Sequence, residues 1–113
     1  FRACSLKKAD LTDAVVDECD FGESILEGAK LRRTSAKKSL FMRADLRFSD
    51  LRGSDLSEAL FEKAQVHGAD MRGVNFFRAD MAKVRGDKGT QMADAYLVQV
   101  RSVPETGEKA GEA

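Results

Sequence analysis

The sequence predicts an all-β fold in which the chain winds as a four-walled coil, with about 4–5 coils of 20 residues. From Cys4 to Val84 every fifth residue is small, and two positions after each small residue stands a larger apolar one, with Ala36 as the weak member. Phenylalanine recurs every twenty residues, at Phe1, Phe21, Phe41 and Phe61. Four segments of five residues therefore complete one turn of the coil.

A step of five residues suits neither a helix nor a flat strand. On an α-helix it rotates the side chain by about 140°, and on a strand an odd step alternates between the two faces. Both columns are buried if each five-residue segment forms one wall and both columns point into the lumen. Successive turns then stack at the strand spacing of ~4.8 Å, while outward positions are free to carry charge.

Six segments carry a shared tripeptide: Ala9-Asp10-Leu11, Ala44-Asp45-Leu46, Ser49-Asp50-Leu51, Ser54-Asp55-Leu56, Ala69-Asp70-Met71 and Ala79-Asp80-Met81. They resemble the A(D/N)LXX signature of pentapeptide-repeat proteins. The resemblance covers residues 1 to about 84 and implies a right-handed quadrilateral β-helix. The family includes proteins that imitate DNA, bind DNA gyrase and topoisomerase IV and confer fluoroquinolone resistance, although most members have no assigned activity.

The pattern divides the chain into three parts. Residues 1–84 are the predicted pentapeptide-repeat β-helix. Residues 85–100 begin with a turn of two glycines and resume the pattern one residue late, so they are predicted to form an irregular final coil or cap. Residues 101–113 hold the only proline and little that could pack, which predicts a flexible tail or linker. Because Phe1 replaces an initiator methionine while the repeat is already in phase, we expect a longer, bacterial protein.

The composition points away from catalysis. Cys4 and Cys19 fall in the small inward column, where a thiol acts as an apolar filler, and His67, the only histidine, is predicted to point outward. No nucleophile with a base and no cluster of metal ligands converges, so we predict no enzyme, no metal, no cofactor and no small-molecule substrate. No apolar run is long enough for a membrane helix, and we predict a cytoplasmic location without membrane contact.

Charge decides between two functions. The 19 basic residues balance the 19 acidic ones, and when outward residues are sorted by wall, no wall becomes a polyanion. An imitation of DNA needs concentrated acidic residues that stand in for phosphates. The leading prediction is therefore a non-catalytic protein–protein interaction or structural scaffold module. The alternative is a DNA-mimicking inhibitor or protector of gyrase or topoisomerase, and direct nucleic-acid binding is disfavoured further.

Two outward features are candidate sites. Arg32, Arg52 and Arg72 lie twenty apart and predict a vertical stripe that could grip anions bidentately. The alternative, which we favour, is that Asp50 and Asp70 neutralise this stripe as a solvated network.

The second feature is apolar. Before the central residue, where the family usually places Asp or Asn, this chain has Val15, Ile25, Leu40 and Leu60. Leu40 and Leu60 should stack beside Met42 as a contact for an unidentified protein partner. Phe77, which is predicted to point outward like Phe48, is a further candidate contact. Scattered surface apolarity is the competing explanation, and self-association remains open.

Overall fold

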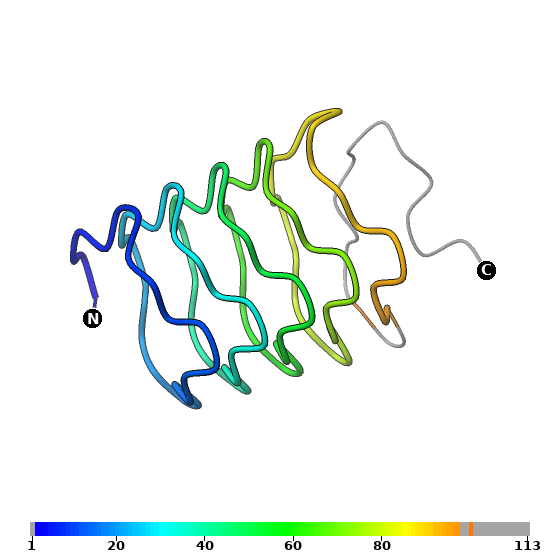
Figure 1. The fold of residues 1–113 in the computed structure, drawn as a ribbon, viewed down its shortest axis with the longest axis horizontal. Coiled ribbons are helices and arrows are strands. Elements are labelled where there is room, and N and C mark those ends of the chain that lie inside the picture. Colours follow the sequence, from blue (N-terminus) through cyan, green and yellow to red (C-terminus); the bar gives the residue numbers. More distant parts are fainter. Residues whose placement is uncertain (1, 98–99, 101–113) are drawn as a thin grey trace.

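The computed structural model describes residues 2–97 and 100, which wind as a right-handed quadrilateral β-helix. Figure 1 shows the closed turns stacked side by side along the long axis, with the N-terminus at one end of the stack. Within the described ranges the backbone pairs through single-residue parallel bridges rather than through long strands or helices. The fold class predicted from the two periodicities is confirmed.

The bridges give the register of the coil. From Ser5↔Ile25 to Gln65↔Arg85 the bridged residues are 20 positions apart, and at Asp70↔Gln91 the separation becomes 21. The extra residue lies between Arg85 and Gln91, because other neighbouring bridging residues are five positions apart. The amide of Thr90 there donates to the Asp87 carbonyl at 3.1 Å, which closes the enlarged corner.

Each wall ends in a tight corner. The central residue is followed by a post-central residue and a corner residue, and the next small residue donates its N–H back to the central carbonyl, as Ala9 does to Leu6 at 2.9 Å. Every non-glycine residue with positive φ among the described residues occupies this corner position, for example Lys8 with φ 60° and Lys63 with φ 61°. A positive φ at the third residue only is the pattern of a type II turn.

The predicted pile of phenylalanines is present in the core. The rings of Phe21 and Phe41 stack with centroids 5.1 Å apart, and those of Phe41 and Phe61 at 4.9 Å, with interplanar angles of 10° and 4°. Phe76 meets Phe61 edge-on at 5.9 Å. Each such pair stabilises by about 0.5–1.5 kcal/mol beyond the burial of its area. The stack therefore fixes the spacing of successive coils at about 5 Å.

Hydroxyls in the small column are satisfied inside the coil. Thr34 donates to the Leu11 carbonyl at 2.7 Å, which ties one coil to the previous one, and Ser49 donates to the Leu46 carbonyl of its own turn at 2.7 Å. A buried polar group without a partner would cost roughly 1–3 kcal/mol. The column can hold serine and threonine because central carbonyls lie within reach.

Candidate functional site

The position just before each central residue, called the bridging position here, explains why the repeat favours aspartate. A carboxylate or amide oxygen there accepts the N–H of the post-central residue two positions later, as Asp10 does from Thr12 at 3.0 Å and Asp80 from Ala82 at 3.0 Å. The same bond is made by Asp20, Asp45, Asp50, Asp55, Asp70 and Asn75. This Asx turn locks the start of each corner.

Leu40 and Leu60 occupy bridging positions and break this rule. Together with Met42, the post-central residue after Phe41, they are called the leucine patch here. Leu40 and Leu60 pair as a parallel bridge and so stack on one wall; Leu60 is 37% exposed, while Leu40 and Met42 are half-buried. A leucine cannot accept an amide proton, and the N–H groups of Met42 and Glu62 have no hydrogen-bond partner in the part of the chain that the structure describes. The patch therefore forgoes two bonds that aspartate would make.

Phe77 lies apart from the leucine patch. It is the post-central residue of the neighbouring wall, where its ring packs 6.3 Å from that of Tyr96 and under the guanidinium carbon of Arg78 at 5.1 Å. Phe48 is 63% exposed on a third wall. The structure thus brings together three of the four predicted contact residues and leaves Phe77 in a separate aromatic cluster.

The arginines of the predicted stripe form ion pairs with aspartates of the same wall. Arg32, Arg52 and Arg72 with Asp50 and Asp70 are called the paired arginine wall here. Arg52 forks onto Asp50 at 2.9 and 2.8 Å, and Arg72 forks onto Asp70 at 2.8 and 2.7 Å. Diagonal contacts of 3.6 Å join Arg32 to Asp50 and Arg52 to Asp70. The hydrogen bonds from Arg52 and Arg72 hold the pKa values of Asp50 and Asp70 below their ordinary value. Anion binding by this stripe stays a prediction.

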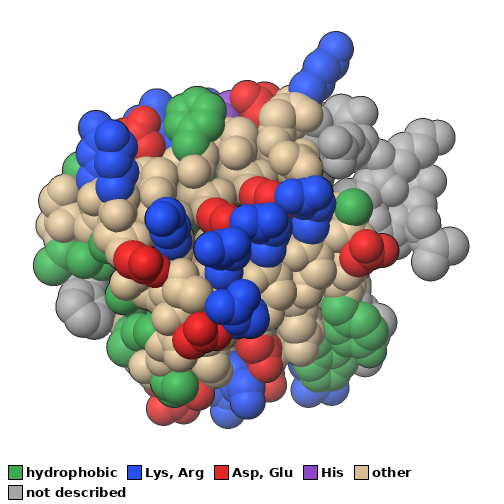
Figure 2. Space-filling view, viewed as in Figure 1, with side chains coloured by type: hydrophobic (Ala, Val, Ile, Leu, Met, Phe, Trp, Pro, Cys, Tyr) green, Lys and Arg blue, Asp and Glu red, His purple; other side chains and the backbone are tan. Residues whose placement is uncertain are grey.

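Charges of both signs alternate elsewhere as well. Figure 2 shows basic and acidic side chains side by side over one face, with apolar groups scattered among them. Arg47 forks onto Asp45 at 2.8 Å through both nitrogens, and Arg33 forks onto Asp13 of the previous coil at 2.8 and 3.1 Å. A carboxylate held by a guanidinium presents little negative potential to a partner.

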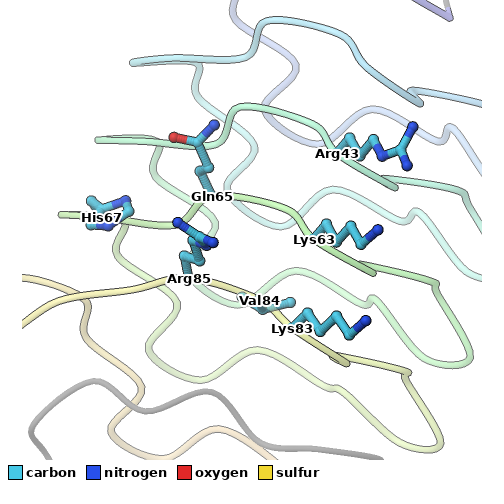
Figure 3. Close-up of a pocket in the computed structure, with 7 residues that line it drawn as sticks. All are labelled: Arg43, Lys63, Gln65, His67, Lys83, Val84 and Arg85. Carbon is cyan, nitrogen blue, oxygen red and sulfur yellow. The ribbon is translucent and has the colours of Figure 1, made fainter.

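A hollow of about 670 Å³ departs from this pairing, and we call it the basic groove. Its lining residues are Arg43, Lys63, Gln65, His67, Lys83, Val84 and Arg85. In Figure 3 Arg43, Lys63 and Lys83 form parallel rungs on one side, and Gln65, Arg85 and His67 come from the adjoining wall. None of the four cations forms an ion pair with a described residue.

Sequence reasoning missed this groove because it summed charges over whole walls. The signal was available in one column: Arg43, Lys63 and Lys83 share the corner position and are twenty residues apart. His67, predicted as a solvated surface residue, is half-buried, and its Nδ1 is shielded without a hydrogen-bond partner among the described residues.

The residues considered for chemistry do not form a reactive cluster. Cys4 and Cys19 are free and half-buried. Among residues 2–97 and 100 no three histidine, cysteine or acidic side chains gather where they could hold a metal ion. The same residues include no helix with the length and hydropathy that crossing a bilayer requires.

Comparison with known families agrees with this geometry. The model of pentapeptide repeats matches residues 4–41 and 39–76, with eight copies. The chain belongs to the pentapeptide-repeat family, as the tripeptide signature predicted. No curated protein matches the chain.

Solved structures share the fold. A pentapeptide repeat protein, Rfr23, from the cyanobacterium Cyanothece 51142 is 24% identical with a TM-score of 0.73, and the match covers 74% of this chain and 56% of that one. One from the thylakoid lumen of Arabidopsis thaliana is 26% identical with a TM-score of 0.56, covering 83% and 61%. A trypsin-treated form of QnrB1, a plasmid-mediated fluoroquinolone resistance protein, is 16% identical with a TM-score of 0.60, covering 89% and 69%. The chain thus spans less than two thirds of the length of Rfr23 and of the Arabidopsis thaliana protein.

Proposed function

We propose that this chain is a non-catalytic scaffold module that binds a protein partner through the leucine patch, on the wall that carries Phe21, Phe41 and Phe61. The partner meets a rigid surface, because successive coils are locked by hydrogen bonds and by the stacked rings beneath Leu40 and Leu60. We place this interaction in the cytoplasm, where Cys4 and Cys19 remain thiols.

One observation carries the proposal. Leu40 and Leu60 occupy bridging positions at which aspartate makes an Asx bond elsewhere in the same chain. A net hydrogen bond is worth about 0.5–1.5 kcal/mol, so leucine is the less favourable residue at these sites for the isolated fold. Burial of the two side chains against a partner compensates, since each apolar Å² removed from water contributes roughly 25 cal/mol.

The alternative, imitation of DNA at a topoisomerase, is supported by the fold of QnrB1 alone. Its requirement is a surface of unpaired carboxylates along the coil axis. In this chain Asp45, Asp50 and Asp70 are each gripped by the arginine two residues later. We therefore expect no protection of gyrase against a quinolone in a supercoiling assay, and protection would reverse the ranking.

The test of the leucine patch replaces Leu40 and Leu60 together by asparagine. Asparagine restores the Asx acceptor, as Asn75 shows by accepting from Phe77 at 3.0 Å, and leaves the net charge unchanged. The double variant should therefore remain folded. We expect it to lose at least about tenfold in partner capture and in any self-association, measured by affinity capture from the source cell and by native mass spectrometry.

The matched control is Val15→Asn with Ile25→Asn, because these aliphatic residues share the bridging position but lie on other walls, 75% and 44% exposed. The control should keep the partners and the mass of the unmodified chain. Equal capture by both double variants, with equal masses, would remove the leucine patch from the function.

A further inference from the structure

The corner column that borders the basic groove stacks like charges on successive coils. Arg43, Lys63 and Lys83 follow one another at the coil spacing, which is 4.9 Å at the Phe41–Phe61 stack. Ions of one sign placed directly opposite one another are destabilising. A corner column can avoid this, since Asp13 and Arg33 pair within theirs at 2.8 Å.

The three other corner columns contain no such run. In coil order they read Asp13, Arg33, Gly53, Gly73, Asp94; Glu18, Lys38, Glu58, Arg78; and Lys8, Gly28, Phe48, Gly68. Each of these three therefore either alternates in sign or has neutral residues after its single cation. The groove column itself begins with Ala3 and Glu23 before its three cations, and Glu23 pairs with Arg2 at 2.8 Å. The column of Arg43, Lys63 and Lys83 is thus distinguished by position and by sign together.

The adjoining wall adds a fourth cation and further donors. Arg85 and Gln65 pair as a parallel bridge, so they occupy neighbouring coils on the wall that adjoins the corner of Lys63 and Lys83. His67 lines the same hollow, and its Nδ1, which is shielded from solvent, has no hydrogen-bond partner within residues 2–97 and 100. Unsatisfied buried groups are uncommon in folded proteins. Cations, an amide and an imidazole thus line one hollow, and none of its four cations has an acidic partner among the described residues.

We propose that the basic groove binds a small linear anion carrying two or more phosphate groups. Lysine binds phosphate as a point charge, and arginine can bind it bidentately. A row of charges repeated about every 5 Å suits an extended oligophosphate better than a single anion, which would contact one or two rungs. The hollow lies within the roughly 300–1,000 Å³ range of small-molecule sites.

The binding energetics follow from the charges. A bound oligophosphate removes the repulsion between Lys63 and Lys83 and replaces it with charge-assisted hydrogen bonds. Because the anion binds only where the coil stacks these residues, it binds the folded chain and not the unfolded one. Binding should therefore raise the melting temperature of the protein as ligand concentration increases.

The test measures binding of inorganic tripolyphosphate by isothermal titration calorimetry at low salt, with orthophosphate and tricarballylate as comparison anions. We expect submillimolar affinity for tripolyphosphate and at least about tenfold weaker binding of the other two, as expected when fewer charge-assisted contacts form. Lys63→Gln with Lys83→Gln should weaken tripolyphosphate by about tenfold or more.

Lys8→Gln with Lys38→Gln is the matched control. These lysines are also exposed corner residues, with φ of 60° and 58° against 61° and 58° for Lys63 and Lys83, and the change in net charge is the same. The control should bind within about twofold of the unmodified chain. Absence of tripolyphosphate binding, equal loss in both double variants, or equal affinity for tricarballylate would overturn the proposal.

Discussion

The paired arginine wall and the basic groove are two ladders of cations built on the same repeat, with opposite electrostatic outcomes. In the wall Arg52 and Arg72 each fork onto an aspartate of their own coil, and Arg52 also reaches the next one diagonally. In the groove Arg43, Lys63 and Lys83 have no acidic partner among the described residues. The spacing of twenty residues is identical, so spacing alone does not determine whether a ladder can bind an anion.

The position within the five-residue unit makes the difference. A post-central arginine lies beside the bridging residue two positions earlier, and an aspartate there neutralises it at 2.7–2.8 Å. A corner residue can pair with the corner residue of the adjacent coil, as Arg33 does with Asp13. When three adjacent coils all place a cation at the corner, this compensation is lost. Charge in a β-helix must therefore be summed by column rather than by wall.

The largest expected effect removes the spacing on which both ladders depend. Phe41→Ala deletes the ring between Phe21 and Phe61 and leaves a cavity in the core, which should cost about 3–5 kcal/mol of unfolding free energy. Chemical denaturation followed by circular dichroism measures the loss. Phe48→Ala, at a ring that is 63% exposed, should cost less than about 0.5 kcal/mol. Similar losses in the two variants would contradict the stacked core.

The second effect tests the paired arginine wall through its pH dependence. The hydrogen bond from Arg72 lowers the pKa of Asp70 relative to its ordinary value of 3.8. Because the folded pKa lies below the unfolded one, this stabilisation is complete above the unfolded pKa and is lost as pH falls through the folded value. Asp70→Asn should therefore flatten the decline in stability below about pH 5 and reduce proton uptake on unfolding by up to about one proton.

Asp80→Asn is the control for this effect. Asp80 is also a bridging aspartate with an Asx bond, to Ala82 at 3.0 Å, but the residue two positions later is not an arginine. Both asparagines can keep the Asx acceptor, so the two variants differ in the ion pair. The pH dependence of the unfolding free energy, measured between about pH 2 and pH 7, should change less in Asp80→Asn than in Asp70→Asn. Equal flattening in both variants would show that the ion pair between Asp70 and Arg72 is unimportant.

A smaller effect concerns two glycines at corner positions. Gly68 and Gly53 are both corner residues with φ of 68°, so alanine at either should cost about 1–2 kcal/mol. At Gly68 the new Cβ would also lie 2.5 Å from Cδ1 of Phe48, whereas at Gly53 the nearest atom is 3.8 Å away on Arg33. Gly68→Ala should therefore be the more destabilising by thermal unfolding. If Gly53→Ala costs as much, the ring of Phe48 moves aside freely.

Much of the fold follows from the sequence because it depends on strictly local repetition. The step of five and the phenylalanines at twenty-residue intervals predicted the four walls and the stack of Phe21, Phe41 and Phe61. Inward positions are read directly from size and polarity, since each coil contacts only its neighbours. The stacking of Leu40 and Leu60 was predicted for the same reason, since both depart locally from the aspartate rule and lie twenty residues apart.

The basic groove could not be read in the same way, because it combines residues from two walls across a corner. Lys63 and Lys83 belong to the corner column of one wall, and Arg85 to the bridging column of the next. Whether they converge depends on side-chain directions that the repeat pattern does not specify. The packing of Phe77 against Tyr96 was not predicted, since it depends on the shift to a 21-residue bridge.

The smallest expected effect is an increase in the unfolding free energy, and its sign tests whether the cations of the groove repel one another. Lys63→Glu places a carboxylate between Arg43 and Lys83 and converts the groove ladder into an alternating column like that of Asp13 and Arg33. We expect this substitution to raise the unfolding free energy by roughly 0.2–1 kcal/mol, the range of exposed ion pairs, while abolishing tripolyphosphate binding. Urea denaturation at low and at high salt measures the gain, which should shrink as salt screens the pairs. A variant that is less stable than the original at low salt would show that the three cations do not repel one another, and the electrostatic basis of the groove would then be lost.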